Sequence, residues 1–187
     1  MSYNKLGLWR CIMGVKRGTV ELEDYNPEWK ESYEKERDLL KKVLKDKIVG
    51  IEHVGSTAVP GLKSKPIIDI CVAIKNLEDA VEFEEILKPY DYHFRGHQGV
   101  MDRYFYAKGP EENRTHYVHF ETLESDSYQN HILFRDYLIK HPEYIEKYKK
   151  LKEELAEKYP EERSKYTAGK SEFIQSVIQL AKEELND

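Results

Sequence analysis

A small-residue turn, Gly55-Ser56, precedes an aspartate, Asp69, that stands in an otherwise apolar, β-branched run. The backbone N–H groups of a tight Gly-Ser turn, together with the serine hydroxyl, can bind a phosphate. An aspartate on the adjoining strand can hold the divalent cation that neutralises such a phosphate. Thr57 and Lys65 add a hydroxyl and a positive charge within reach of the same anion. This spacing indicates metal-assisted nucleotide chemistry.

Each of these two features has a second interpretation. The Gly55-Ser56 pair is either a phosphate loop or an ordinary connection between strands. Asp69 is flanked by isoleucines, where a carboxylate is costly to bury without a partner. It is either a metal ligand or general base, or one half of a structural ion pair with Arg103 or Arg114, because structural networks also produce such sites.

A third candidate element is the run Thr115–Thr122, which contains two histidines and a glutamate. His116 and His119 are three positions apart, so a regular strand points them to opposite faces and they cannot share one ion. His119 and Glu121 do share a face, and they converge on Asp69 if the two strands are neighbours. His119 is then a candidate general base and Glu121 a second metal ligand. The alternative for His119 is a hydrogen-bonded polar residue of the sheet.

Basic residues offer further contacts to a phosphorylated ligand. Arg103 and Arg114 stand at the starts of predicted strands, and guanidinium groups bind phosphate oxygens bidentately. Lys170, in the C-terminal helical region, is a further candidate for ligand binding. For each of these residues the alternative is a solvated surface charge. The charge run Glu146–Lys165 is predicted to be a solvated helical face.

The composition restricts the class of protein. A chain of 187 residues is long enough for one well-buried core and short for two. With 40% hydrophobic and 35% charged residues, it is typical of a soluble globular protein with long, charged helices. The net charge of -5 argues against a general nucleic-acid binder, and it leaves room for a local basic pocket. Two cysteines, Cys11 and Cys71, give neither a disulfide framework nor a metal-site spacing. Cys71, in an apolar strand, is expected to be a small buried hydrophobe.

No apolar run approaches the length needed to cross a bilayer, so we expect a cytoplasmic protein that does not bind membranes. A helix is expected to begin at Asn26-Pro27-Glu28 because of its capping residue and first-turn proline. Val20-Glu21-Leu22 alternates like a short strand. The other predicted elements are a helix from Asn76 to about Lys88, strands at Ile48–Val54, Pro66–Ile74, Tyr90–Phe94, Arg103–Ala107 and Thr115–Thr122, and helices near 125–140, 142–159 and 161–185.

The predicted elements form an α+β protein: a mixed sheet with flanking helices, followed by a subdomain of three helices. In the strand Pro66–Ile74, Asp69, Cys71 and Ala73 share one face. The other face, which is the core face, carries Ile68, Ile70, Val72 and Ile74. We expect an N-terminal extension at 1–19 and one domain at 20–187, with a sheet half at 20–123 and a helical half at 124–187. The sequence does not predict an oligomeric state.

Several motifs together resemble one known family. They are Tyr25-Asn26-Pro27-Glu28-Trp29, the block from Ile51 to Leu62 with its Gly55-Ser56-Thr57-Ala58-Val59-Pro60-Gly61 core, Lys65-Pro66-Ile67-Ile68-Asp69-Ile70, Arg114-Thr115-His116-Tyr117-Val118-His119, Phe134-Arg135-Asp136-Tyr137-Leu138, and Tyr166 through Phe173. This pattern resembles the GrpB family of small bacterial proteins in the nucleotidyltransferase superfamily, and the likeness spans about Val20 to Ala181. The resemblance implies a nucleotidyltransferase-like mixed sheet, with Gly55-Ser56 at the phosphate loop and Asp69 as the first carboxylate. The sequence also resembles a domain that is fused to dephospho-coenzyme A kinase in some bacteria.

The sequence departs from the pattern of active nucleotidyltransferases at residue 71. Such enzymes carry a second acid two residues after the first, and here that position is Cys71, whose thiol is a poor ligand for Mg²⁺. Two hypotheses follow. The first is an enzyme that transfers a nucleotidyl group from a nucleoside triphosphate to an unidentified small acceptor, with Mg²⁺ held by Asp69 and Glu121. The second is an inactive module that binds a nucleotide, coenzyme A or another phosphorylated small molecule.

Overall fold

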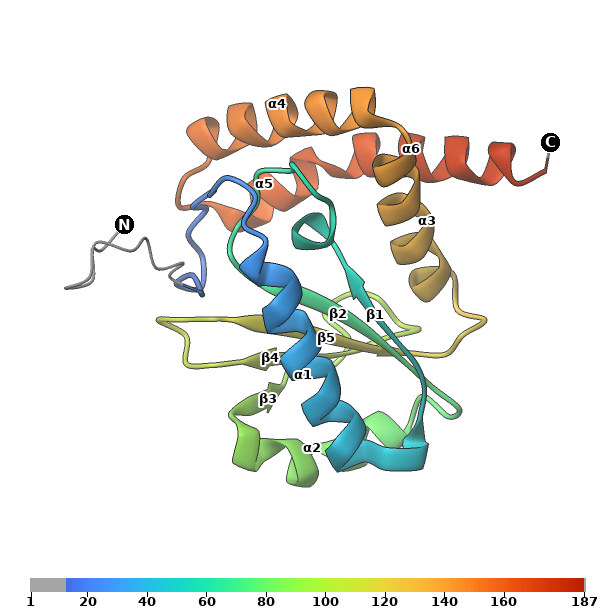
Figure 1. The fold of residues 1–187 in the computed structure, drawn as a ribbon. Helices are drawn as coiled ribbons and strands as arrows, with labels where there is room; N and C mark the ends of the chain where they lie inside the picture. The colour runs from blue at the N-terminus through green and yellow to red at the C-terminus, as the bar shows by residue number, and fades with distance from the viewer. Residues whose placement is uncertain (1–12, 187) are drawn as a thin grey trace.

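A five-stranded mixed sheet lies at the centre of the protein, in a computed structural model that describes residues 13–186 (Figure 1). The strand order is β1-β2-β5-β4-β3, and only the β2–β5 pair is parallel. The strands are β1 Ile48–Val54, β2 Ile68–Ile74, β3 Tyr92–Phe94, β4 Tyr104–Lys108 and β5 His116–Glu121. The predicted strands are therefore confirmed within two residues at each end, except for the short one at 20–22. In its place Glu23 forms a single β-bridge with Ser64.

Two helices, α1 (Glu28–Leu44) and α2 (Asp79–Leu87), cover the core face of the sheet. The backbone N–H of Glu28 donates a hydrogen bond to Asn26 Oδ1 at 2.9 Å, so the predicted helix start is confirmed. Trp29 and Leu40 of α1 are completely buried, against the apolar side chains that β2 and β5 present on this face. The main hydrophobic core thus lies between this helix pair and the sheet.

The other face of the sheet is partly covered by helices from the C-terminal half. These are α3 Asp126–Lys140, α4 Pro142–Lys158, α5 Arg163–Gly169 and α6 Ser171–Glu184. In Figure 1, α4, α5 and α6 gather on the side of the molecule away from α2. A second apolar cluster joins Phe134 of α3, Tyr148 of α4 and Val177 of α6 to Leu62, which follows β1. The helical half is therefore packed onto the loop that leaves β1.

The helix predicted near 161–185 consists of two helices, α5 and α6, that meet at Gly169 and Lys170. A Cβ atom at Gly169 would lie 2.5 Å from the side chain of Leu155, so the glycine permits a close approach between α5 and α4. The turn between α5 and α6 carries Lys170, which lines two cavities described below. A periodic apolar pattern continues across this turn, so the pattern alone cannot reveal it.

The part of the predicted N-terminal extension that includes Cys11 lies outside the described residues. Of the remainder, Val15 forms a β-bridge with Arg114, and the backbone N–H of Gly14 donates to the carbonyl of Pro66 at 2.9 Å. Among residues 13–186, no helix is both long and apolar enough to span a lipid bilayer.

Candidate functional site

The parallel pairing of β2 with β5 brings four polar side chains to the sheet face opposite the main core. Cys71 pairs with His119, and Asp69 and Glu121 stand two positions away on their strands. Paired residues on neighbouring strands point to the same side, so Asp69, Cys71, His119 and Glu121 share one face. His116 points the other way, with its Nε2 atom 3.8 Å from Glu36 on α1. The expectation that the two histidines lie on opposite faces is confirmed.

The loop after β1 lies directly against Asp69. Gly55 has φ 69° and ψ −170°, a conformation that only glycine adopts readily. A Cβ atom at this position would lie 2.8 Å from Asp69 Oδ2. Ser56 then begins a short 3₁₀ turn, Ser56–Ala58, labelled η2. Glycine is therefore required both by the turn and by the close approach to the carboxylate.

Thr57 supports this loop from inside and does not line the cavity around Asp69. Its side chain is buried, with Oγ1 3.0 Å from His53 Nε2 and 3.5 Å from the carbonyl of Ile67. The ring of His53 stacks on Tyr33 of α1 with 4.7 Å between ring centroids. Thr57 thus holds the loop to the sheet, whereas Ser56 faces the open space.

Asp69 is open to a cavity and is not paired with an arginine. About 33% of its side chain is exposed, and His119 Nε2, 3.5 Å from Oδ1, is its ion-pair partner among the described residues. Burial favours a raised pKa for this carboxyl group. The hydrogen bond and charge of His119, with the charge of Lys65, outweigh burial and hold the pKa of Asp69 below its usual value. The structure gives no ion pair to Arg103 or Arg114, so Asp69 is available to a ligand.

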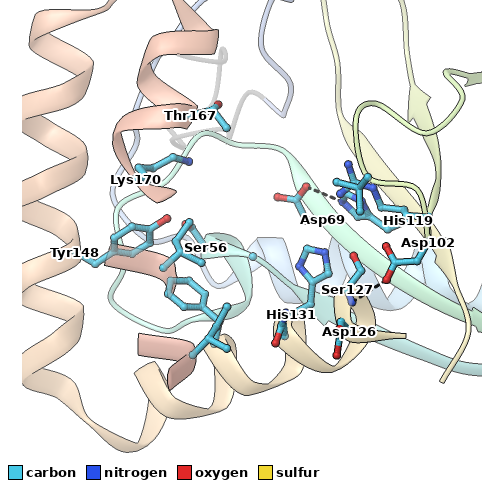
Figure 2. A pocket seen from close by; sticks show the side chains of 17 residues that line it. Ser56, Asp69, Asp102, His119, Asp126, Ser127, His131, Tyr148, Thr167 and Lys170 are labelled. Atoms are coloured by element: carbon cyan, nitrogen blue, oxygen red, sulfur yellow. Dashed lines mark hydrogen bonds and ion pairs between the residues drawn. The ribbon is translucent and has the colours of Figure 1, made fainter. Parts of the chain in front are cut away.

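The cavity in front of Asp69, here called the main cavity, has a volume of about 590 Å³. It lies between the polar face of the sheet and helices α3 to α6, and its polar lining includes Gly55, Ser56, Asp69, Asp102, Arg103, His119, Asp126, Ser127, Asn130, His131, Thr167 and Lys170. Figure 2 shows Asp69 and Lys170 pointing into it from opposite walls, with His119 behind Asp69. Phe134 and Ile174 add apolar lining. A cavity of this size can hold a nucleotide-sized molecule.

A smaller space of about 170 Å³ adjoins the main cavity at Ser56, Asp69, Thr167 and Lys170. Four cationic side chains line it, and we call it the basic subsite: Lys65, Lys152, Arg163 and Lys170. Asp69 is the one carboxylate in its lining. Four basic side chains against one carboxylate give this space a lining that would suit an anion.

The lysines of the basic subsite are strongly perturbed. Burial, followed by the charges of Arg163 and Lys170, lowers the pKa of Lys65 to about 7. Burial and Arg163 lower the pKa of Lys170 to about 8, although Asp69 opposes the change. Lys152 is 1% exposed, and burial lowers its pKa well below the usual value. A bound anion would raise the pKa values of these buried amino groups and so favour their protonated forms.

Arg103 and Arg114 lie in different places. Arg103 lines the main cavity, and its buried Nε atom has no hydrogen-bond partner. Arg114 is buried and donates a hydrogen bond to the carbonyl of Gly109. It lines a separate space of about 660 Å³, here called the arginine cavity, together with Arg17, Arg95 and Arg163. Of the two predicted arginines, only Arg103 thus faces the same space as Asp69.

Glu121 is completely buried behind the cavity wall. Ser127 Oγ donates a hydrogen bond to Glu121 Oε1 at 2.6 Å, and His131 Nε2 lies 3.7 Å from the same oxygen. Three possible ligand atoms lie within 4.8 Å of one another: a carboxylate oxygen of Glu121, a ring nitrogen of His131 and the sulfur of Cys71. Within the described residues this is the one such group of three or more metal-binding side chains, and Asp69 is outside it.

Sequence reasoning missed the residues that the helices contribute. Lys152 and Arg163 belong to the charge run Glu146–Lys165, which was predicted to be a solvated helical face. This is wrong for Lys152, whose buried side chain donates a hydrogen bond from Nζ to the carbonyl of Lys63. Ser127 and His131 are four residues apart on α3, so they share a helix face. That spacing is the signal that could have found them.

Comparison with known proteins gives the family and the fold of this chain. A likeness at TM-score 0.50 and 14% identity to a cytoplasmic RNA terminal U-transferase, over 72% of this chain and 42% of that one, shows a nucleotidyltransferase-like fold. A family model described as GrpB protein matches residues 19–180, and the chain belongs to the GrpB family. The crystal structure of the conserved protein GrpB from Enterococcus faecalis has a TM-score of 0.83 at 33% identity, covering 89% of this chain and 100% of that one.

Two curated relatives are similar in sequence. The glutamate-rich protein GrpB of Alkalihalophilus pseudofirmus is 35% identical over 171 residues, which cover 89% of this chain and 98% of that protein. The UPF0157 protein YqkA of Bacillus subtilis is 36% identical over 163 residues, 87% of this chain. These residues cover 47% of YqkA, so the chain spans about half the length of that relative.

Proposed function

We propose that the protein binds a nucleoside triphosphate and transfers its nucleotidyl group to a small acceptor. The observation that carries the proposal is the basic subsite, in which Lys65, Lys152 and Lys170 surround a space next to Asp69. A bound phosphate would raise their lowered pKa values, so these lysines would take up protons as the phosphate binds. The adjoining main cavity has room for the nucleoside. The nucleotidyltransferase-like fold is compatible with this assignment.

The proposed roles follow from position. Ser56, at the start of its 3₁₀ turn, lines both spaces and offers its hydroxyl and backbone to the triphosphate. An acceptor hydroxyl attacks the α-phosphorus, the bond to the bridging oxygen breaks, and pyrophosphate leaves with its charge neutralised by Lys65 and Lys170. His119 takes the hydroxyl proton, and Asp69, 3.5 Å away, stabilises the imidazolium that forms.

The residues around Asp69 fit one Mg²⁺ ion and not a pair. Asp69 offers the cavity a carboxylate that is one-third exposed, and Mg²⁺ in nucleotide sites uses one or two carboxylates with phosphate oxygens. The next residue on this strand face is Cys71, which is not an oxygen ligand. Glu121 lies close to Cys71 and His131, in a group to which Asp69 does not belong. Bound through Asp69 and the triphosphate, Mg²⁺ would neutralise phosphate charge. No second ion is assigned to this step.

Substitution of Asp69 tests the proposed transfer. In an assay that follows the α-phosphate label from nucleoside triphosphate into product, Asp69→Asn is expected to lower turnover at least about 100-fold. Its Tm should change by less than about 4 °C, because the carboxylate is part-exposed and has one weak partner. Asp126→Asn is the control, since it removes the same charge from an exposed carboxylate on the main cavity. A fully active Asp69→Asn variant would contradict the mechanism.

A second candidate function is a module that binds a nucleotide or coenzyme A without transfer. Cys71 favours it, because a completely buried thiol stands where an active enzyme would carry its second acid. Calorimetric titrations with nucleoside triphosphates and coenzyme A, with and without Mg²⁺, separate the two functions. Magnesium-independent binding without product supports the module, and product formation supports the transferase.

A further inference from the structure

Three potential metal ligands from three different elements meet behind the main cavity. Cys71 comes from β2, Glu121 from β5 and His131 from α3, and their sulfur, oxygen and nitrogen atoms all lie within 4.8 Å of one another. Cys71 and Glu121 are completely buried, whereas 29% of the His131 side chain is exposed. His131 also lines the main cavity, so the group is buried on one side and reachable on the other.

The carboxylate of Glu121 lacks the partners that a buried charge requires. Its Oε1 atom accepts the hydrogen bond of Ser127, but the buried Oε2 atom has no hydrogen-bond partner. Within the described residues, the ion-pair contact of Glu121 is His131 at 3.7 Å, and no lysine or arginine lies within 4.0 Å of it. The charge of Arg103 acts on Glu121 only from beyond that distance, so the buried carboxylate is compensated only in part. A cation held between these side chains would complete that compensation.

We propose that Cys71, Glu121 and His131 bind a divalent transition metal of borderline softness, of which Zn²⁺ is the representative. A thiolate, an imidazole and a carboxylate are ligands that Zn²⁺ accepts together, whereas Mg²⁺ requires oxygen ligands throughout. The thiol of Cys71 therefore disfavours a second Mg²⁺ beside Asp69 but favours a softer ion in the group behind it. Zinc sites that bind water or substrate have three protein ligands and a fourth coordination position that is open to a cavity, and this group has the same arrangement.

The geometry requires only a small adjustment. Zinc bonds of about 2.0 to 2.3 Å in a tetrahedron place ligand atoms roughly 3.3 to 3.7 Å apart. The 3.7 Å between His131 Nε2 and Glu121 Oε1 already matches this spacing. Because all three atoms lie within 4.8 Å of one another, no separation must contract by more than about 1.5 Å. His131, part-exposed on the surface of α3, is the side chain with freedom to move. The hydrogen bond from Ser127 already fixes one oxygen of Glu121, as an outer-shell partner of a metal ligand does.

Cobalt(II) substitution tests the proposal directly, because a thiolate bound to Co²⁺ gives an intense near-ultraviolet charge-transfer band. Purified, metal-stripped protein is titrated with Co²⁺, and then with Zn²⁺ as competitor. The expected result is one Co²⁺ per chain with a thiolate band that Zn²⁺ abolishes and a large excess of Mg²⁺ does not. The matched variants are Cys71→Ser, which should lose the band, and Cys11→Ser, which should keep it.

A second variant keeps the test valid if Cys71→Ser fails to fold. His131→Ala, at a part-exposed helix position, should retain the far-ultraviolet circular dichroism of the native protein and weaken Zn²⁺ binding by more than about 100-fold. Asp69→Asn should leave the cobalt band intact, which separates this site from the proposed nucleotide chemistry. The proposal is overturned if the band is absent, if it depends on Cys11, or if His131→Ala binds Zn²⁺ as tightly as the native protein.

Discussion

Replacing Gly55 by alanine should damage both the stability and the ligand binding of this protein. The backbone at Gly55 has φ 69° and ψ −170°, a region that costs other residues about 1 to 3 kcal/mol. The new Cβ atom would also lie 2.8 Å from Asp69 Oδ2, where ordinary contacts begin at 3.4 Å, so the carboxylate or the loop must move by about 0.6 Å. We expect a stability loss of about 2 to 4 kcal/mol, or roughly 5 to 15 °C in Tm for a chain of this length.

The matched control is Gly61→Ala in the same loop. Gly61 also has a positive φ, 81°, but a Cβ atom there meets nothing within 4 Å. It should therefore show backbone strain alone, with nucleotide affinity within about twofold of the native value, because Asp69 does not move. Urea denaturation gives the two stabilities, and calorimetric titration with a nucleoside triphosphate gives the two affinities. If Gly55→Ala were no more destabilised than Gly61→Ala and bound nucleotide normally, the close approach of loop and carboxylate would have no functional meaning.

Three further predictions concern charged groups. Lys65 and Lys170 have pKa values of about 7 and 8 in the fold, below the usual 10.5, so the unfolded chain binds more protons and stability should rise with pH from about 7 to 10. Phosphate affinity should fall over pH 7 to 9 as these amines lose their protons. Lys65→Met should make both the stability measured by thermal melts and the affinity measured by titration less dependent on pH. If Lys65→Met and the native protein showed the same pH dependence, the assignment would be contradicted. Lys152→Met should raise Tm by a few degrees, because burial of the amino group opposes folding. It should weaken phosphate binding about tenfold, because the bound phosphate loses an amine that can take up a proton and pair with it. A fall in Tm with unchanged affinity would argue against a binding role. Arg135→Ala should lower the free energy of unfolding, measured in urea, by about 1 to 2 kcal/mol without changing phosphate affinity. The reason is that Arg135 of α3 forms an ion pair with Glu52 of β1, with 2.7 Å between a guanidinium nitrogen and a carboxylate oxygen. A loss of affinity alone would place Arg135 in the site.

The sheet and its polar face were predictable from the sequence because strand alternation is a local property. In β2 every second residue is apolar, so Asp69 and Cys71 had to share the opposite face. The convergence of His119 on Asp69 depended on which strands are neighbours, and the β2–β5 pairing meets that condition. The position of Gly55 against Asp69 follows from the antiparallel register, in which Val54 pairs with Asp69, and only the structure gives this pairing and the 2.8 Å approach.

The helical wall of the site could not be predicted in this way. An amphipathic pattern identifies the inward side of a helix but not the element it meets. The spacing of Ser127 and His131 could therefore show that they share a helix face, but not that this face lines the cavity with Asp69. Lys152 also belongs to a strongly charged run, where burial of a single lysine contradicts the average pattern. The break between α5 and α6, which positions Lys170, lies where Gly169 packs closely against Leu155 on another helix. Long-range contacts of this kind do not appear in a local pattern.

A crystal structure with a non-hydrolysable nucleoside triphosphate and Mn²⁺ tests the central claim most directly. We predict that the terminal phosphates contact Lys65 and Lys170 in the basic subsite, with Mn²⁺ joining a phosphate oxygen to Asp69. Phosphates bound instead beside Arg114 in the arginine cavity, or a nucleotide absent at saturating concentration, would contradict the account.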